Sequence, residues 1–192
     1  VADCTGHGVP GAILSILCSS LMKQSFTNRE IDSPAEALNV IRHQLSRLFD
    51  SGNSLKIKDG MNVGFGIIDK EKKLIRYSGA HFTAFVLRDN DWIELRGSIQ
   101  HVGHSDDPKP FENIDFAYES GDQLYLFTDG FVDQFGGGNN KKYMKRKLMD
   151  FVKSIGHESM EIQRGLIEIE FLNWKGKEEQ TDDICCFGLR LD

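Results

Sequence analysis

The sequence has 192 residues, a length that predicts one domain with its own core. Hydrophobic residues make up 40% and charged residues 27%, which is ordinary globular usage and excludes a disordered tail, a coiled coil and a collagen-like repeat. Lys and Arg number 23 and Asp and Glu 29, giving a net charge of −6. That balance argues against a nucleic-acid partner, because proteins that neutralise phosphates are normally basic.

The hydrophobic runs and the cysteines indicate whether the domain contacts a membrane and in which cellular compartment it lies. No apolar run approaches the roughly 18 residues that a membrane helix needs, so we expect no membrane contact by this domain. Cys4, Cys18, Cys185 and Cys186 show no C-x-x-C spacing, which predicts neither a zinc site nor a disulfide framework and favours the reducing cytoplasm. The sequence starts at Val1 rather than Met, and we interpret it as part of a longer protein.

Two helices are predicted near the start of the chain. After a glycine-rich loop, apolar residues recur at helical spacing over 12–27 and predict a helix with a wide buried face that includes Ile13 and Ile16. Ser33 and Glu36 form a capping box at the start of the second helix, which an apolar stripe continues.

The middle of the chain changes to the alternation that is typical of strands. Strands are predicted at 61–68, 74–78, 82–88, 92–96, 114–118 and 123–128, the last buried on both faces. Two further helices are predicted near 141–155 and 160–171, followed by a last strand at 184–191, in which Cys185 and Cys186 face the core and a helix. Short turns between neighbouring strands imply antiparallel pairing, and helices packed on antiparallel sheets make an α+β layered domain.

Acidic residues lie at the ends of three predicted strands. Asp3 opens the glycine-rich loop, Asp129 precedes a glycine, and Asp182 and Asp183 come just before the last strand. Carboxylates at strand ends can converge on one hard cation, and oxygen ligands favour Mg²⁺ or Mn²⁺ over zinc. Each aspartate alone is better explained as a turn residue that accepts hydrogen bonds from nearby N–H groups, so the case for a metal site depends on their combination.

Five motifs in order carry a resemblance to a known family. They occupy 3–12 (Asp-Cys-Thr-Gly-His-Gly-Val-Pro-Gly-Ala), 59–61 (Asp-Gly-Met), 77–80 (Tyr-Ser-Gly-Ala), 121–130 (Gly-Asp-Gln-Leu-Tyr-Leu-Phe-Thr-Asp-Gly) and 180–184 (Gln-Thr-Asp-Asp-Ile). The chain resembles the metal-dependent protein phosphatases of the PPM (protein phosphatase 2C-like) superfamily, in its bacterial SpoIIE branch. Phe-Gly-Gly at 135–137 and Trp-Lys-Gly at 174–176 resemble a subgroup often fused to membrane or sensor modules.

The resemblance implies a fold and a domain boundary. The expected fold is a four-layer α-β-β-α sandwich of antiparallel sheets flanked by helices, formed by one domain over 1–192 that lacks its first strands and is N-terminally truncated. A further metal-bridging aspartate of the family would lie upstream of Asp3, so the intact parent protein can be an active phosphatase even where this fragment binds metal poorly or is inactive. A missing strand would also leave an unpaired sheet edge, which invites a dimer.

The resemblance also implies a site with two Mn²⁺ or Mg²⁺ ions that activate a water for attack on phosphoserine or phosphothreonine. Asp3 and the backbone carbonyl of Cys4 would bind one metal and Asp129 and Asp182 the other. Asp183 would lie behind these ligands or bind a third metal. For His7, packing of the loop is the better interpretation, and proton donation to the leaving oxygen is the alternative. The glycine-rich loop either binds an anion through its N–H groups or simply turns the chain.

Three functions follow from this reading. The leading one is a cytoplasmic serine/threonine phosphatase domain. Its expected substrate is a phosphorylated regulatory protein of the anti-anti-sigma (STAS-domain) type. By the same resemblance it could be the cytoplasmic part of a membrane-anchored sensor protein. The alternative is a catalytically inactive PPM-like module that binds such a regulator, against which the retention of Asp3, Asp129 and Asp182 argues. A hydrolase of another phosphoester, such as a nucleotide, has no supporting motif in the sequence.

Overall fold

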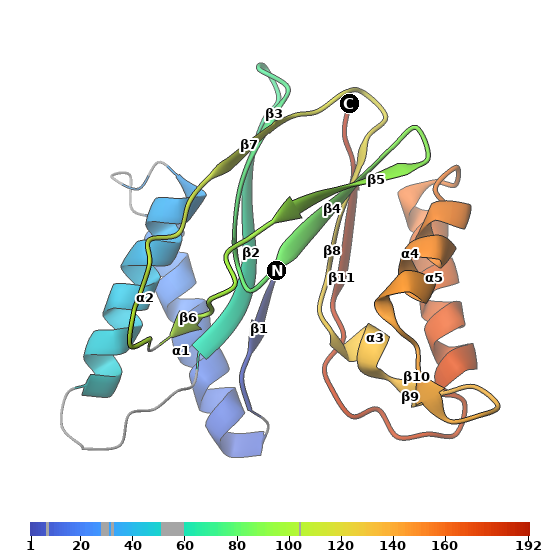
Figure 1. The fold of residues 1–192 in the computed structure, drawn as a ribbon, viewed down its shortest axis with the longest axis horizontal. Coiled ribbons are helices and arrows are strands. Elements are labelled where there is room, and N and C mark those ends of the chain that lie inside the picture. The colour runs from blue at the N-terminus through green and yellow to red at the C-terminus, as the bar shows by residue number, and fades with distance from the viewer. Residues whose placement is uncertain (7, 28–30, 32, 51–59, 104) are drawn as a thin grey trace. The chain divides into compact units, whose positions relative to one another are not determined.

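The computed structural model describes residues 1–6, 8–27, 31, 33–50, 60–103 and 105–192, with the backbone alone at 26, 49 and 50. The chain divides into two compact units, Val1–Ala84 with Leu95–Tyr118 and Phe85–Glu94 with Glu119–Asp192. Each unit contains an antiparallel sheet and a pair of long helices (Figure 1), which confirms the predicted α+β class. No described helix is both long and apolar enough to cross a membrane.

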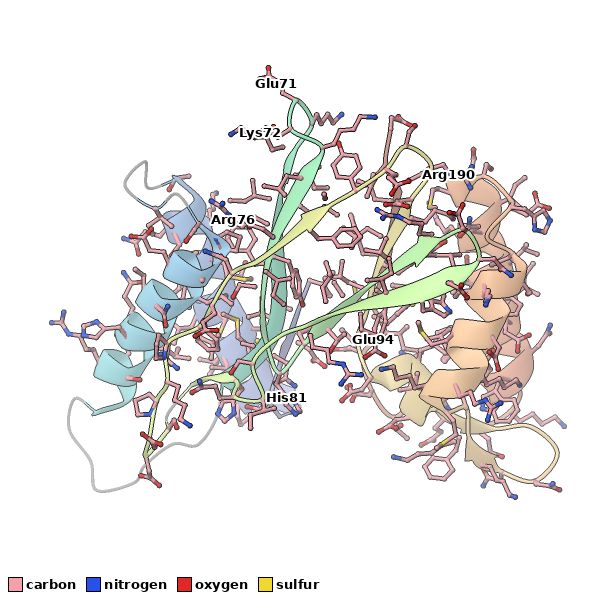
Figure 2. All side chains as sticks on the ribbon, turned by 45° about the horizontal axis from the view of Figure 1, so that its top comes forward. Glu71, Lys72, Arg76, His81, Glu94 and Arg190 are labelled. Atoms are coloured by element: carbon pink, nitrogen blue, oxygen red, sulfur yellow. The ribbon has the colours of Figure 1, made fainter. Side chains whose placement is uncertain are left out.

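The first unit has a sheet of short and long strands beside two helices. Its elements are β1 (Ala2–Cys4), α1 (Gly8–Thr27), α2 (Pro34–Asp50), β2 (Gly60–Asp69), β3 (Leu74–Ala80), β6 (Val102–Gly103) and β7 (Ile114–Ala117). The strand order is β1-β2-β3-β7, with β6 also paired to β2. The long hairpin of β2 and β3 ends in a turn whose tip carries Glu71 and Lys72 (Figure 2). Apolar residues of both helices, among them Cys18, Leu38 and Ile41, pack with Met61 and Val63 of β2.

The start of α2 follows the predicted capping pattern. The Glu36 N–H donates to Ser33 Oγ (3.2 Å), as an N-cap serine requires. A second acceptor comes from far along the chain, since the Ala35 N–H donates to Asn113 Oδ1 (2.9 Å). The cap therefore both starts the helix and ties it to the segment before β7.

Helix α1 departs from the prediction on one face. Ile13 and Ile16 are 62% and 71% exposed, although the sequence places them on a wide buried face. Leu14, Cys18 and Leu21 supply the buried side instead. Because apolar residues surround much of α1, periodicity alone did not separate the face that packs from the face that does not.

The second unit has a four-stranded sheet in the order β11-β8-β4-β5. Its elements are β4 (Thr83–Arg88), β5 (Asp91–Arg96), β8 (Gln123–Phe127), α3 (Gly130–Asp133), β9 (Phe135–Gly136), β10 (Lys141–Lys142), α4 (Lys145–Ser154), α5 (Met160–Lys175) and β11 (Cys186–Arg190). The first two residues of β4 and the last two of β5 belong to the first unit. Aromatic residues dominate its core, among them Phe85, Tyr125, Phe131 and Phe171. As predicted for a strand buried on both faces, Gln123 to Leu126 of β8 are all buried.

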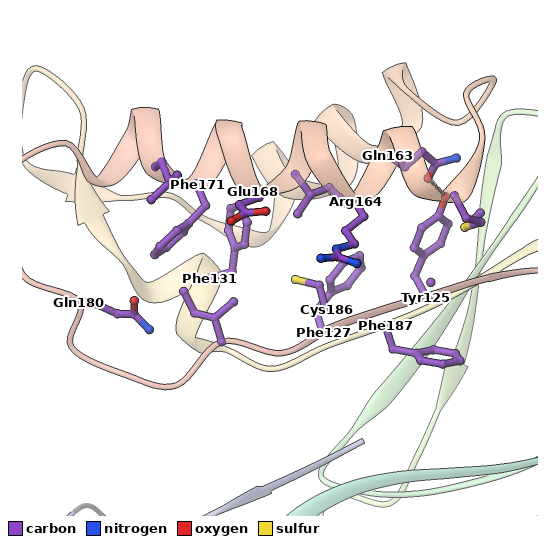
Figure 3. A pocket seen from close by; sticks show the side chains of 15 residues that line it. Tyr125, Phe127, Phe131, Gln163, Arg164, Glu168, Phe171, Gln180, Cys186 and Phe187 are labelled. Carbon is purple, nitrogen blue, oxygen red and sulfur yellow. Dashed lines mark hydrogen bonds between the residues drawn. The ribbon is translucent and has the colours of Figure 1, made fainter.

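Two predictions at the C-terminal end are wrong. The predicted helix at 141–155 begins only at Lys145, because 141–142 pair with β9 and Met144 takes a φ of 75° before the helix. Cys185 and Cys186 are both exposed, so neither lies in the core, although the Cys186 side chain does face α5 as predicted (Figure 3). Among the described strands, β11 pairs with β8 alone, so one long side of the strand has no neighbour to cover it.

A buried ion pair joins β4 to the turn before β8. Asp122 is 3% exposed and accepts hydrogen bonds from Arg88 Nε (2.9 Å) and Nη2 (2.6 Å) and from the Glu119 N–H (2.9 Å). Burial by itself would raise the pKa of Asp122, but these hydrogen bonds and the charge of Arg88 outweigh it and lower the pKa. Asp122 thus has a structural role within the fourth motif.

Replacing Asp122 by Asn should lower the free energy of unfolding by about 3 kcal/mol, because it leaves the Arg88 guanidinium without its buried counter-charge. Since the folded pKa of Asp122 is lowered, its contribution is complete above the unfolded value of about 3.9 and is lost as the pH falls below it. Urea unfolding at pH 7 and pH 3 measures both effects, and the variant should lose less stability on acidification than the wild type.

The matched control for this prediction is Asp115→Asn. Asp115 forms a similar two-bond pair with Arg76, but that pair lies on the surface with both side chains over 40% exposed. Exposed pairs contribute little, so this change should leave stability near the wild-type value. Equal losses from the two variants would contradict the importance of burial at Asp122.

Candidate functional site

Asp3 and Cys4 form the end of β1 in the first unit. They lie opposite Asn62 and Met61 of β2. Just beyond them, the Thr5 N–H donates to the Gly60 carbonyl (2.9 Å) and the Gly60 N–H donates to Thr5 Oγ1 (3.0 Å). These bonds join the first and second sequence motifs at one end of the sheet.

The loop after β1 is shaped by glycines. Gly6 has a φ of 89°, a conformation that favours glycine, and a Cβ on Gly11 would lie 2.6 Å from the Gly6 carbonyl oxygen. The turn therefore packs directly against the first turn of α1. This supports the turning role of the loop, while its alternative role in binding an anion stays a prediction. His7 and Asp59 lie outside the described residues.

The side chain of Cys4 is directed towards the core of the first unit. Cys4 is half-buried and packs with the residues around Cys18 and Leu14. A hydrogen bond with the Cys18 thiol lowers the pKa of the Cys4 thiol. Only the backbone of Cys4 is thus left for the ligand role that the sequence suggests, and that role stays a prediction.

Asp129 follows β8 in the second unit and occupies the N-cap position of α3. An N-cap aspartate normally accepts a hydrogen bond from the first turn, but the Asp129 side chain accepts none. In the described part of the chain its exposed carboxylate makes no other hydrogen bond or ion pair either. The interpretation of Asp129 as a turn residue is therefore not supported, and its oxygens are left available for another ligand.

Asp182 and Asp183 lie beside Asp129 because the residues on both sides of Asp129 contact their segment. Thr128 Oγ1 accepts from the Cys185 N–H (2.8 Å) and donates to the Asp183 carbonyl (3.3 Å). A Cβ on Gly130 would lie 2.3 Å from that same carbonyl oxygen, so glycine permits the close approach. The fourth and fifth sequence motifs meet at this point.

The carboxylates of Asp182 and Asp183 are exposed and differ in their hydrogen bonds. Asp182 Oδ1 accepts from the Asp183 N–H (2.8 Å), as in a turn, which leaves its second oxygen without a described partner. Asp129 and Asp182 thus offer hard oxygen donors that suit Mn²⁺ or Mg²⁺. Asp3 belongs to the first unit. In the described ranges, no three His, Cys, Asp or Glu side chains are grouped closely enough to hold a metal.

A cavity of about 610 Å³ lies in the second unit, between α5 and the strands β8 and β11 (Figure 3). Its walls are mainly apolar, including Phe127, Phe131 and Phe171. At one end Tyr125 donates a hydrogen bond to Gln163 Oε1 (2.6 Å). None of the predicted metal ligands lines this cavity, but Gln180 and Ile184, on either side of Asp182 and Asp183, do.

Comparison with known proteins places these motifs in context. The family described as stage II sporulation protein E (SpoIIE) matches residues 1–192. No curated protein sequence matches the chain. Among solved structures, the chain is similar to the SiaA-PP2C domain of Pseudomonas aeruginosa, with 24% identity and a TM-score of 0.87, covering 100% of this chain and 74% of the other.

Two further structures share the fold at lower identity. One contains the PP2C phosphatase domain and a fragment of the regulatory domain of SpoIIE from Bacillus subtilis (16% identity, TM-score 0.74, 100% of this chain and 53% of the other). The other contains the RsbU and RsbW domains of a Mycobacterium tuberculosis protein (15% identity, TM-score 0.75, 98% and 50%). The chain thus spans about half the length of each of these two. The likenesses confirm a PP2C-like fold.

Replacing Gly130 by Ala should lower the free energy of unfolding by about 1–3 kcal/mol, because the new Cβ would overlap the Asp183 carbonyl and force the two segments apart. Gly138→Ala is the control, since nothing lies within 4 Å of a Cβ there, and it should change stability by less than about 0.5 kcal/mol. Thermal unfolding of both variants tests this. A Gly130→Ala protein as stable as the Gly138→Ala protein would rule out the close contact.

Proposed function

Because the chain belongs to the SpoIIE family, whose PP2C-like domains are protein serine/threonine phosphatases, we propose that it hydrolyses phosphoserine or phosphothreonine on a protein with the help of divalent cations. The observation that carries the proposal is the Asp129 carboxylate, which is exposed, caps no helix and lies beside Asp182 and Asp183. A turn residue would satisfy its oxygens locally, whereas a metal ligand must keep them available.

PPM phosphatases are metal-dependent, and the proposed ligands divide between the two units. Asp3 and the Cys4 carbonyl would hold one Mn²⁺ or Mg²⁺ ion, and Asp129 and Asp182 the second, with Asp183 behind them or at a third ion. When bound, such a pair of cations supplies charge neutralisation and a water of lowered pKa. We propose that 1–192 form a single phosphatase domain.

The chain's own residues would then have distinct tasks. The pairing of β1 with β2 fixes the register of Asp3, which lies opposite Asn62. Thr128 and Gly130 hold the Asp183 backbone beside Asp129. His7 remains a candidate for proton donation to the leaving oxygen, with loop packing as the alternative. No serine or cysteine nucleophile is required, in keeping with a Cys4 thiol that is turned towards the core.

The proposed substrate is a phosphorylated regulatory protein, of the STAS-domain type that the family resemblance suggests. The cytoplasm is the proposed compartment, and all four cysteines being free supports a reducing environment. We also propose that an edge of the first sheet that is unpaired among the described strands, at its β1 end, permits a dimer. Light scattering that gives a monomer at all concentrations would contradict the dimer alone.

Asp129→Asn should reduce Mn²⁺-dependent release of phosphate from a phosphoserine peptide by at least about 100-fold, because it removes a charged ligand from the ion. Asp133→Asn is the matched control. Asp133 lies four residues later at the end of α3 and pairs with Lys142 on the surface (2.9 Å), so its loss should change the rate by less than about two-fold.

The same assay separates the competing functions. Wild-type protein that binds a phosphorylated STAS domain but releases no phosphate with either Mn²⁺ or Mg²⁺ would favour an inactive binding module. Release of phosphate from nucleotides but not from phosphopeptides would favour the other hydrolase. If Asp129→Asn and Asp133→Asn have equal rates, Asp129 is not a ligand.

A further inference from the structure

Gln134 is fully buried at the end of α3, five residues after Asp129. Its side-chain Nε2 donates to the Glu179 carbonyl (2.9 Å) and to the Phe135 carbonyl (2.9 Å). Glu179 lies in the irregular segment between α5 and β11 that also carries Asp182. One buried amide therefore links the element that bears Asp129 to the segment that bears Asp182.

The orientation of this amide is determined by its neighbours. Both partners are carbonyl oxygens, which can only accept, so the NH₂ group must face them. The Gln134 Oε1 atom is buried and has no hydrogen-bond partner among the described residues. The amide thus leaves its own oxygen unpaired while it pairs two backbone carbonyls, which an apolar side chain of similar shape could not do.

The backbone of Gln134 is itself held on two further sides. Its carbonyl accepts from Trp174 Nε1 (3.1 Å), at the end of α5, and from the Tyr143 N–H (3.1 Å). The Gly137 N–H in turn donates to the Trp174 carbonyl (2.9 Å). These contacts account for the Phe-Gly-Gly and Trp-Lys-Gly motifs as a rigid support around Gln134.

The segment that bears Asp182 is thus clamped at two points by one stretch of chain. Gln134 holds it at Glu179, three residues before Asp182, and Thr128 holds it at Asp183 and Cys185 just after. Asp129 lies between Thr128 and Gln134 in sequence. Between the two clamps, the hydrogen bonds found among the described residues of the segment are local, such as the one from the Gln180 side chain to the Asp182 carbonyl (2.9 Å).

We propose that Gln134 is a positioning residue that sets the place of Asp182 relative to Asp129, so that both carboxylates bind the same divalent cation. This inference rests on the proposed metal-dependent function. Removing the Glu179 clamp should leave Asp182 on a longer, looser segment, and supporting residues of this kind typically change metal affinity by about 10–100-fold. Phosphate release should then fall at low Mn²⁺ and recover at high Mn²⁺, because the chemical groups themselves are unchanged.

The test compares Gln134→Met with Gln163→Met in the 192-residue chain. Gln163 is a buried glutamine of the same unit, whose amide donates to Gln123 Oε1 (2.8 Å) and the Glu158 carbonyl (3.0 Å), and it touches neither Asp129 nor Asp182. Mn²⁺ affinity is read from the electron paramagnetic resonance of free Mn²⁺, without substrate. Cleavage by an endoprotease specific for Glu reports the looseness of the chain at Glu178 and Glu179.

Gln134→Met should weaken Mn²⁺ binding by at least about 10-fold and speed cleavage at Glu178 and Glu179, while Gln163→Met leaves both near wild type. Equal Mn²⁺ affinity in Gln134→Met and wild type overturns the positioning role and leaves the phosphatase proposal intact. Wild-type protein that binds no Mn²⁺ overturns the cation site at Asp129 and Asp182, and the positioning role with it. If Gln134→Met does not fold, Gln134→Asn keeps the amide but shortens its reach, and it should weaken Mn²⁺ binding more than Gln163→Asn does.

Discussion

The contact between the end of β8 and the segment before β11 determines the candidate site of the second unit. Gly130 approaches the Asp183 carbonyl so closely that no side chain fits, and Thr128 bonds the same backbone from the other side of Asp129. Two stretches more than 50 residues apart in sequence are thereby fixed beside each other. Because these contacts use backbone and hydroxyl groups, the carboxylates of Asp129 and Asp182 stay exposed for an ion.

Buried polar groups hold the rest of this unit in a similar way. Arg88 and Asp122 anchor the turn from which β8 starts. Tyr125 and Gln163 connect the middle of β8 to the first turns of α5. Hydrogen bonds of this kind specify one arrangement where an aromatic core alone would tolerate several, and they keep the strand in register up to its last residue.

Local sequence signals predicted the regular elements well. The capping residue Ser33 and the apolar run of β8 each act over a few residues, and both predictions are confirmed. The hairpin of β9 and β10 has strands of two residues, too short to show any periodicity, and the predicted helix therefore began too early. Exposure of Ile13 and of Cys186 depends on which faces acquire neighbours, which is tertiary information.

The candidate site was only partly accessible to sequence reasoning. Asp129 was predicted because it follows a strand and precedes a glycine, and Asp182 because it lies just before the last strand within a motif of the resembled family. No sequence pattern identified Gln134, because the role of a buried glutamine is seen only from the carbonyls to which it donates hydrogen bonds. Anomalous X-ray scattering at the manganese edge, from crystals grown with Mn²⁺, tests the central claim most directly. The account predicts an anomalous peak within bonding distance of carboxylate oxygens of both Asp129 and Asp182, and a peak bound by neither residue, or no peak, would contradict it.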